Sequence, residues 1–295
     1  MASRTPLAID GNDDAVHAQT QSPLFSAIPA EIRNEIFDLA LREYQDPEKP
    51  YNRYTYYTRP GSFAQTRVDF ALLQTCKRIF KETMPIPLKN LEARFYLGIH
   101  SERVPPDYAY QREYPDEAGF QICSKKRKQE LSSKQWAAIQ HINITAQLIA
   151  LRESCIRQLF ADRSGLAPKV VTITIRYTDW WYWENNHPLN LSGVHMRGIS
   201  FPNSVERIVM QLETREGKRK ELEQVIADLF ARPEVNKYSV TDGRDLMLSE
   251  EIGVKEWQWD GPTVFAKAAK RRSNKYPHHP EGLEMRYIVK ELTWI

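Results

Sequence analysis

The first ninety residues change from a polar stretch to two helical patterns. Residues 1–21 are polar and acidic without an apolar period, which predicts a disordered tail, because such a segment buries too little surface to offset ordering. From residue 22 the pattern predicts a helix over about 29–43 and a second helix from Asp69 to Pro85. We expect both apolar stripes to be buried, with Ile36 and Leu73 among the core residues.

Two later segments lack such a pattern. Residues 42–68 carry several prolines and little apolar period, and residues 101–130 are similar, so the sequence predicts a loop at both places. Residues 91–97 between them are expected to form a strand.

The rest of the chain alternates between strand and helix patterns. Ile142 and Ile144 alternate as in a strand, a helical stripe runs from Leu148 to Leu159, and residues 171–177 alternate again, which predicts a β-α-β unit. A second strand and helix follow at 208–212 and 222–230, and residues 285–294 are expected to form a last strand. The fold class predicted is α+β, with N-terminal helices followed by irregular β-α units that form a mixed sheet with helices packed on it.

Composition and charge indicate which partners and which cellular location to expect. The 295 residues include 41 basic and 38 acidic side chains, a net charge of +3, which favours neither nucleic acid nor a membrane surface as a partner. The sequence has no apolar run long enough to span a membrane, and its beginning is acidic where a signal peptide is apolar. With three cysteines in no paired pattern, an intracellular location, cytoplasmic or nuclear, is expected.

Signatures of catalysis are missing from the sequence. Motifs for phosphate cradles, acyl transfer and zinc proteases do not occur, so no catalytic residue, cofactor or metal site is predicted. One enzyme hypothesis remains open: Asp179 and Glu184 flank Trp180-Trp181-Tyr182-Trp183 and would form a carboxylate pair in an aromatic cleft. The competing interpretation is the end of a strand whose aromatic rings alternate between core and surface.

Two segments suggest a nuclear factor associated with nucleic acid. Residues 53–59 mix arginines with tyrosines, and Lys125-Lys126-Arg127-Lys128 is a dense basic run. Neither segment accompanies a recognised nucleic-acid-binding motif, and a basic run in a loop is more often a solvated segment or a nuclear-import signal than a binding groove.

Two short segments resemble a known family. Ile28-Pro29-Ala30-Glu31-Ile32, within Ser22 to Leu41, resembles the opening of an F-box, and residues 72–82, LLQTCKRIFKE, resemble the later F-box helix. Together they look like a group of fungal F-box-like proteins that pair an IPxEIRNxIF helix with an LLQTCKRIFxE helix. An ordinary F-box is one run of about 45 residues, whereas residues 42–68 interrupt the pattern here.

The resemblance implies a domain plan and a function. Residues 22–90 would form the F-box-like helical module with the inserted loop 42–68, and residues 91–295 a β-α domain that binds a protein partner. An F-box binds the Skp adaptor of a cullin ubiquitin ligase, and the rest of the chain selects a substrate. We expect the adaptor contact at the start of the first helix, at Leu24, Ile28, Pro29 and Ile32. The alternative is that the two helices form a purely structural nucleus.

Overall fold

The computed structural model describes residues 16–99, 101–113, 121–126, 130–191, 198–265, 276 and 278–295. Most of the tail predicted for residues 1–21 therefore lies outside the described residues, and residues 16–21 contain neither helix nor strand. The chain divides into two compact units, one comprising Met1–Arg42 and Val68–Pro87, the other Glu43–Arg67 and Leu88–Ile295. We call them the small unit and the large unit.

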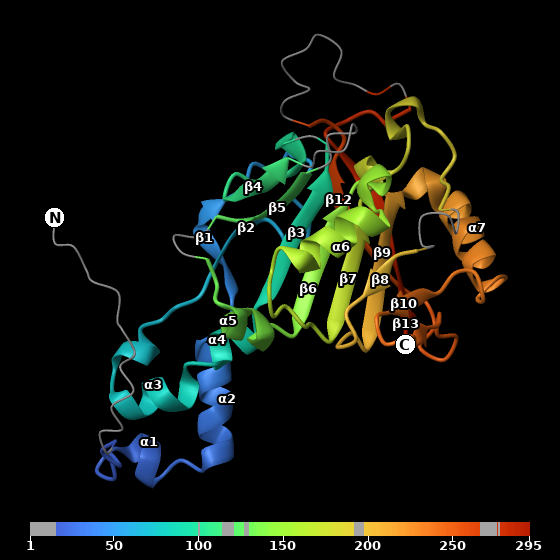
Figure 1. Ribbon diagram of the computed structural model, residues 1–295. Helices are drawn as coiled ribbons and strands as arrows, with labels where there is room; N and C mark the ends of the chain where they lie inside the picture. Colours follow the sequence, from blue (N-terminus) through green and yellow to red (C-terminus); the bar gives the residue numbers. More distant parts are fainter. Residues whose placement is uncertain are drawn as a thin grey trace. The chain divides into compact units, whose positions relative to one another are not determined.

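The small unit is helical in its described part (Figure 1). Its elements are α1 (Pro23–Ser26), α2 (Ala30–Ala40), a 3-10 turn (Leu72–Gln74), α3 (Lys77–Thr83) and the start of α4 (Ile86–Lys89). Pro29 precedes the first residue of α2, and Glu31 lies in its first turn, where a carboxylate stabilises the positive end of the helix dipole. The first predicted helix is therefore confirmed, although it ends at Ala40 and not at residue 43.

The second predicted helix is wrong in its extent. The pattern predicted one helix from Asp69 onward, but Cys76 has an extended backbone that separates the 3-10 turn from α3. The Cys76 Sγ accepts a hydrogen bond from the Ile79 amide at 3.5 Å, so this residue caps the N-terminus of α3. Leu73, which was expected in the core, is only half-buried.

The large unit contains a mixed sheet of eight strands among the described residues. Their order is β12-β13-β9-β7-β6-β3-β5-β4. The four central strands β9, β7, β6 and β3 are parallel, and the two strands on each side are antiparallel to their neighbours. The bounds are β3 (Glu92–Gly98), β4 (Tyr108–Glu113), β5 (Gln121–Lys125), β6 (His141–Ala146), β7 (Val170–Ile175), β9 (Arg207–Arg215), β12 (Lys255–Pro262) and β13 (Glu284–Trp294).

Smaller elements complete the large unit. A hairpin-like pair consists of β1 (Tyr44–Pro50) and β2 (Ala64–Arg67), and a second small sheet consists of β8 (Ser200–Phe201), β10 (Tyr238–Val240) and β11 (Asp245–Leu246). The helices are α5 (Ser133–Ala138), α6 (Glu153–Ala161) and α7 (Arg219–Phe230). The predicted mixed sheet of an α+β chain and its β6-α6-β7 unit are confirmed. The loops predicted for 42–68 and 101–130 instead contain β1, β2, β4 and β5.

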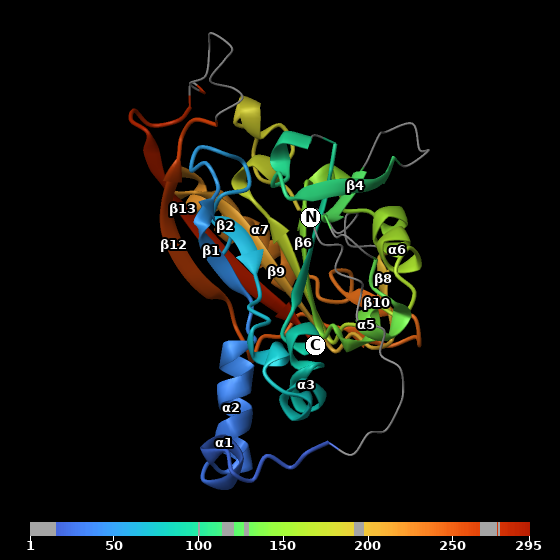
Figure 2. The ribbon, with the colours of Figure 1, turned by 90° about the vertical axis from the view of Figure 1, so that its left-hand side faces the viewer.

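The two faces of the sheet differ in chemistry. Along β6, Ile142, Ile144 and Ala146 are fully buried in the main core with side chains of α6 and α7, whereas the intervening residues of β6 are polar and half-buried. Helix α6 lies against the apolar face, and β1 and β2 lie on the opposite side (Figures 1 and 2). Such alternation places every second residue of a strand on the same face. The large unit thus has one apolar and one polar sheet face.

Candidate functional site

A cluster of charged and aromatic side chains joins the helices of the small unit. The Phe25 ring lies under two guanidinium groups, with its centroid 5.0 Å from the Arg33 Cζ and 3.9 Å from the Arg78 Cζ. Glu82 accepts a hydrogen bond from the Arg78 Nε at 2.9 Å and lies 3.7 Å from the Arg33 Nε. Because these residues come from α1, α2 and α3, the cluster fixes the three helices relative to one another.

Helix α2 carries two apolar faces. Phe37 is buried, together with Leu41 just after the helix, whereas Ile32, Ile36 and Leu39 are 50%, 41% and 64% exposed. The exposed residues have the spacing i, i+4 and i+7 and share one face, and Phe37 lies about 140° away from Ile32 around the helix. We call Ile32, Ile36 and Leu39 the exposed stripe.

The exposed stripe corrects the expectation that Ile36 is a core residue. The buried apolar side chains among the described residues of the small unit are Phe37, Leu41, Ile79 and, at the end of the unit, Pro87. Such a small core accommodates only one face of α2, and the larger Phe37 ring occupies it. The periodic pattern thus identified a helix face correctly but assigned it to the wrong environment.

The four predicted adaptor-contact residues lie on consecutive segments. Leu24 in α1 and Ile28 in the connection to α2 are half-buried, while Pro29 and Ile32 at the start of α2 are exposed. Arg33 Nη1 donates to the Ile28 carbonyl oxygen at 3.4 Å, which ties this connection to α2. Ile36 and Leu39, which were not predicted to be exposed, continue the apolar spacing from Ile32 along the same face of α2.

The two carboxylates that flank residues 180–183 have different environments. Asp179 is buried and accepts hydrogen bonds from the Arg176 Nε at 2.6 Å and the Arg103 Nη1 at 3.0 Å. Glu184 is exposed and lies 3.9 Å from the Arg103 Nη2. Both carboxylates therefore face the same guanidinium, and the oxygens of Asp179 are used in ion pairing.

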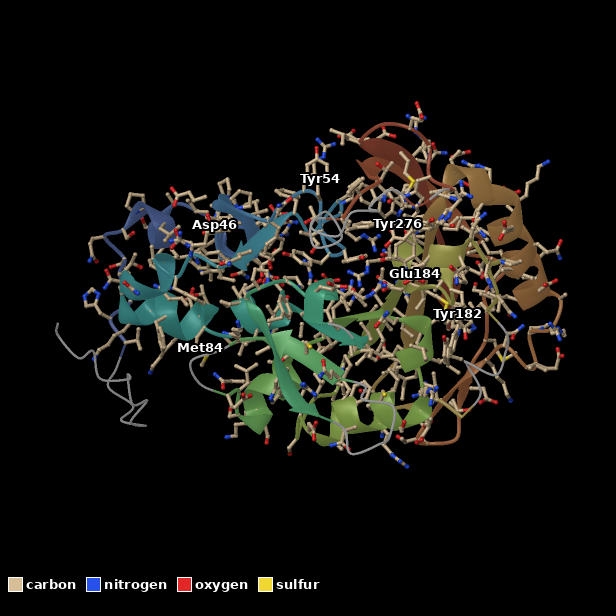
Figure 3. All side chains as sticks on the ribbon, turned by 90° about the horizontal axis from the view of Figure 1, so that it is seen from above. Asp46, Tyr54, Met84, Tyr182, Glu184 and Tyr276 are labelled. Atoms are coloured by element: carbon tan, nitrogen blue, oxygen red, sulfur yellow. The ribbon has the colours of Figure 1, made fainter. Side chains whose placement is uncertain are left out.

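The aromatic side chains of this segment divide between core and surface. Trp180 and Trp183 are buried, and the Trp180 indole donates to the Glu213 carbonyl oxygen at 2.8 Å, whereas Tyr182 is exposed. Glu184 lies close to Tyr276 (Figure 3), whose pKa is raised, mainly by burial, with a smaller contribution from the Glu184 charge. This division agrees with the packing interpretation of the aromatic run.

Two neighbouring histidines, His278 and His279, pack around the Tyr177 hydroxyl. His279 is buried; its Nδ1 lies 2.8 Å from the Thr263 carbonyl oxygen, and its Nε2 lies 2.9 Å from the Tyr177 hydroxyl. His278 Nε2 also lies 2.9 Å from that hydroxyl. Burial, with further contributions from His278 and Arg215, lowers the pKa of His279 to about 4. Over the described residues, no group of three or more His, Cys, Asp or Glu side chains is arranged to hold a metal ion.

The two basic segments make contacts within the large unit. Tyr56 stacks on Phe265 at 4.4 Å between ring centroids, and Arg59 lies 3.7 Å from Glu213. Lys125 donates to the Thr66 carbonyl oxygen at 2.6 Å and Lys126 to that of Pro106 at 2.7 Å. Arg127 and Lys128 lie outside the described residues. Several basic and aromatic side chains of both segments are therefore engaged in contacts within the protein.

The three cysteines are free thiols, of which Cys123 and Cys155 are buried. Burial raises the pKa of Cys123 to about 12, so its thiol is protonated at neutral pH.

Comparison with known proteins gave no relative: no family model, curated protein or solved structure matches the chain. No helix in the described part of the chain is both long and apolar enough to cross a membrane. Functional inference therefore rests on the residues and their geometry.

Proposed function

We propose that the protein is a non-enzymatic, F-box-like interaction protein that serves as a substrate-recognition subunit of a cullin ubiquitin ligase. The small unit would bind the Skp adaptor, and the large unit would bind a substrate protein. The observation that carries this proposal is the exposed stripe of α2, because docking into an apolar groove requires apolar side chains that the protein's own core does not use.

The division of the chain supports the same proposal. Residues 43–67 belong to the large unit, while the segments before and after them cluster into one small unit. The two segments that resemble an F-box are thus adjacent in space although 27 residues separate Leu41 from Asp69 in the sequence. The insertion is accommodated by the strands β1 and β2, which pair with each other from Tyr44 and Arg67 inward.

The adaptor contact would extend beyond the residues predicted from the sequence. Pro29 and Ile32 are exposed at the start of α2, and Ile36 and Leu39 continue the same apolar surface by two further turns. Leu24 and Ile28 are half-buried, so they would contribute part of their surface to the contact and part to packing within the unit.

A binding assay with purified Skp adaptor tests the proposal. The wild-type chain should bind it, and the double substitution Ile32→Arg and Leu39→Arg should weaken binding at least about a hundredfold, because two charges would enter an apolar contact. The matched control is Asn34→Arg, an exposed position about 160° from Ile32 around the same helix. Circular dichroism should show the same helix content for all three chains.

Two results would contradict the proposal. One is the failure of the folded wild-type chain to bind purified Skp adaptor, and the other is equal binding by the wild type and the double variant. Either result would favour the alternative, in which α2 and α3 serve as a structural nucleus.

A further inference from the structure

The polar face of the large sheet contains a cavity of about 180 Å³. Its floor is formed by side chains of β3, β6, β7 and β9, its side by Trp257 of β12, and its roof by Tyr57 and residues 59–62. The cavity is smaller than the roughly 300–1,000 Å³ of sites for drug-sized ligands, so its occupant would be a small molecule.

The roof is a tight turn of defined conformation. The Arg59 amide donates to the Ser62 carbonyl oxygen at 3.2 Å, and the Ser62 amide donates to the Arg59 carbonyl oxygen at 2.8 Å. Pro60 occupies the first central position and Gly61 the second, with φ +77°, as a type II turn requires. Arg94 Nη1 donates to the Gly61 carbonyl oxygen at 3.0 Å and thereby joins the roof to the floor.

The floor is a polar row across four parallel strands. Strand register pairs Tyr96 with Thr145, Thr145 with Thr174, and Thr174 with Gln211. Residues paired in this way lie side by side on one face of a sheet. Thr174 is buried and donates to the Gln211 Oε1 at 3.2 Å. The floor is therefore a fixed surface built by backbone pairing.

The carboxylate at the cavity is already paired. Glu92 Oε2 accepts from the Arg94 Nε at 2.9 Å, and Glu92 Oε1 accepts from the Asn143 amide at 3.3 Å. Burial raises the pKa of Glu92, but the charges of Arg94 and His141 and these hydrogen bonds outweigh burial and lower it. Both carboxylate oxygens of Glu92 therefore already accept a hydrogen bond from within the protein.

Guanidinium donors, in contrast, remain available. Arg94 has five N–H groups, and its contacts to Glu92 and Gly61 use two of them. Arg59 donates from Nη2 to the Gln211 Oε1 at 3.3 Å, and neither the Arg59 Nη1 nor the Arg94 Nη2 has an acceptor among the described residues. Three arginines and one glutamate line the cavity, Arg176 being the third arginine and already paired with Asp179.

We propose that this cavity binds a small organic anion, whose phosphate or carboxylate group accepts hydrogen bonds from Arg59 and Arg94. Guanidinium groups suit both anions because their N–H groups form a planar fork. The Arg59 guanidinium lies over the Trp257 ring, with 5.4 Å between the Arg59 Cζ and the ring centroid, and Tyr57 in the lining supplies a second aromatic side chain for the uncharged part of the ligand. This site lies wholly within the large unit and does not depend on adaptor binding.

Titration of the full chain with inorganic phosphate and, separately, with succinate tests the site and distinguishes the two anions. We expect saturable one-to-one binding of at least one of them by calorimetry, with a rise in Tm that sodium chloride of equal ionic strength does not produce. Arg94→Gln and Arg59→Gln should each reduce the affinity about tenfold or more. Arg286→Gln, an exposed arginine outside the cavity lining, is the matched control.

Chemical modification provides a measurement that needs no variant. In the wild-type chain, the bound anion should slow the reaction of phenylglyoxal with Arg59 and Arg94, but not with Arg286, as read by mass spectrometry of peptides. The proposal is overturned if neither anion binds saturably, or if binding leaves the modification of Arg59 and Arg94 unchanged. In that case the arginines serve only to pair Glu92, Glu213 and Asp179.

Discussion

The two units use apolar residues in opposite ways. In the large unit one continuous cluster of buried apolar side chains extends from β3 to β13 and includes α6 and α7. The described part of the small unit buries Phe37, Leu41, Ile79 and Pro87, while most of the apolar residues of α2 are exposed. A unit with so small a core derives little free energy of folding from burial, which contributes roughly 25 cal/mol per Å².

The units also differ in where they place charge. The large unit encloses Arg103, Arg176 and Asp179 in its interior, whereas the ion pairs of the small unit, at Arg33, Arg78 and Glu82, are partly exposed. Buried charges are costly unless each has a partner, and exposed pairs contribute little. The fold of the large unit therefore depends on buried apolar contacts and buried ion pairs. The small unit, in contrast, has most of its apolar and charged side chains at least partly exposed, where they are accessible to a partner.

The largest expected effect sharpens the contrast in charge. Asp179→Asn should destabilise the protein by about 3 to 5 kcal/mol, because the buried Arg176 would lose its paired carboxylate and the buried Arg103 would keep only the exposed Glu184, at 3.9 Å. Glu82→Gln in the small unit should cost less than about 1 kcal/mol. Urea unfolding followed by circular dichroism measures both, and similar values for the two variants would contradict the contrast.

The next effect concerns apolar burial. Ile173→Ala, in the centre of β7 with no exposed surface, should cost about 2 to 5 kcal/mol through lost contacts and a residual cavity. Ile36→Ala in the exposed stripe should change stability by no more than about 0.5 kcal/mol. A large loss for Ile36→Ala would show that α2 is covered on both faces, and would remove the basis for a docking surface.

A smaller expected effect is the pH dependence of stability that His279 of the large unit causes. Since the pKa of His279 is lowered to about 4 in the folded chain, the unfolded chain binds more protons between pH 6.5 and 4. Stability should therefore fall as the pH decreases through this window, by up to about 3 kcal/mol, relative to its value above pH 6.5.

The matched variant for this measurement is His279→Gln, which does not titrate. The difference in unfolding free energy between wild type and variant should shrink from pH 7 to pH 4, and a difference independent of pH would show that His279 has an ordinary pKa.

Helices and strands were predicted best where the apolar residues follow a single helical or strand periodicity. Ile142 and Ile144 in β6, the stripe of α6 and the last strand all follow a simple rule, because each presents one face to a large core. Edge strands do not follow this rule: β1 contains Pro47 and Pro50, and β12 alternates polar with aromatic residues, since an edge tolerates proline and polar side chains.

The two candidate sites show why function was harder to predict. Helix α2 has apolar residues on two faces, and the apolar pattern alone does not indicate which of the two faces is buried. In the structure the face with Phe37 is buried, and the exposed stripe faces outward. The anion cavity draws on residues from Tyr57 to Trp257, brought together by strand register and by the turn at Pro60 and Gly61. The pair Pro60-Gly61 predicts a turn from the sequence alone. The contact of this turn with β3, through Arg94, could not be predicted from the sequence.

The division of the chain also has a consequence during synthesis. The chain passes between the units after Arg42, Arg67 and Pro87, so the small unit consists of two segments separated by strands of the large unit. On the ribosome, α1 and α2 emerge before α3 exists, and the exposed stripe and Phe37 together present apolar surface on both sides of α2 during that interval. A fragment that ends before Lys77 lacks α3 and would keep this state permanently, so we expect such a fragment to aggregate unless a chaperone binds it.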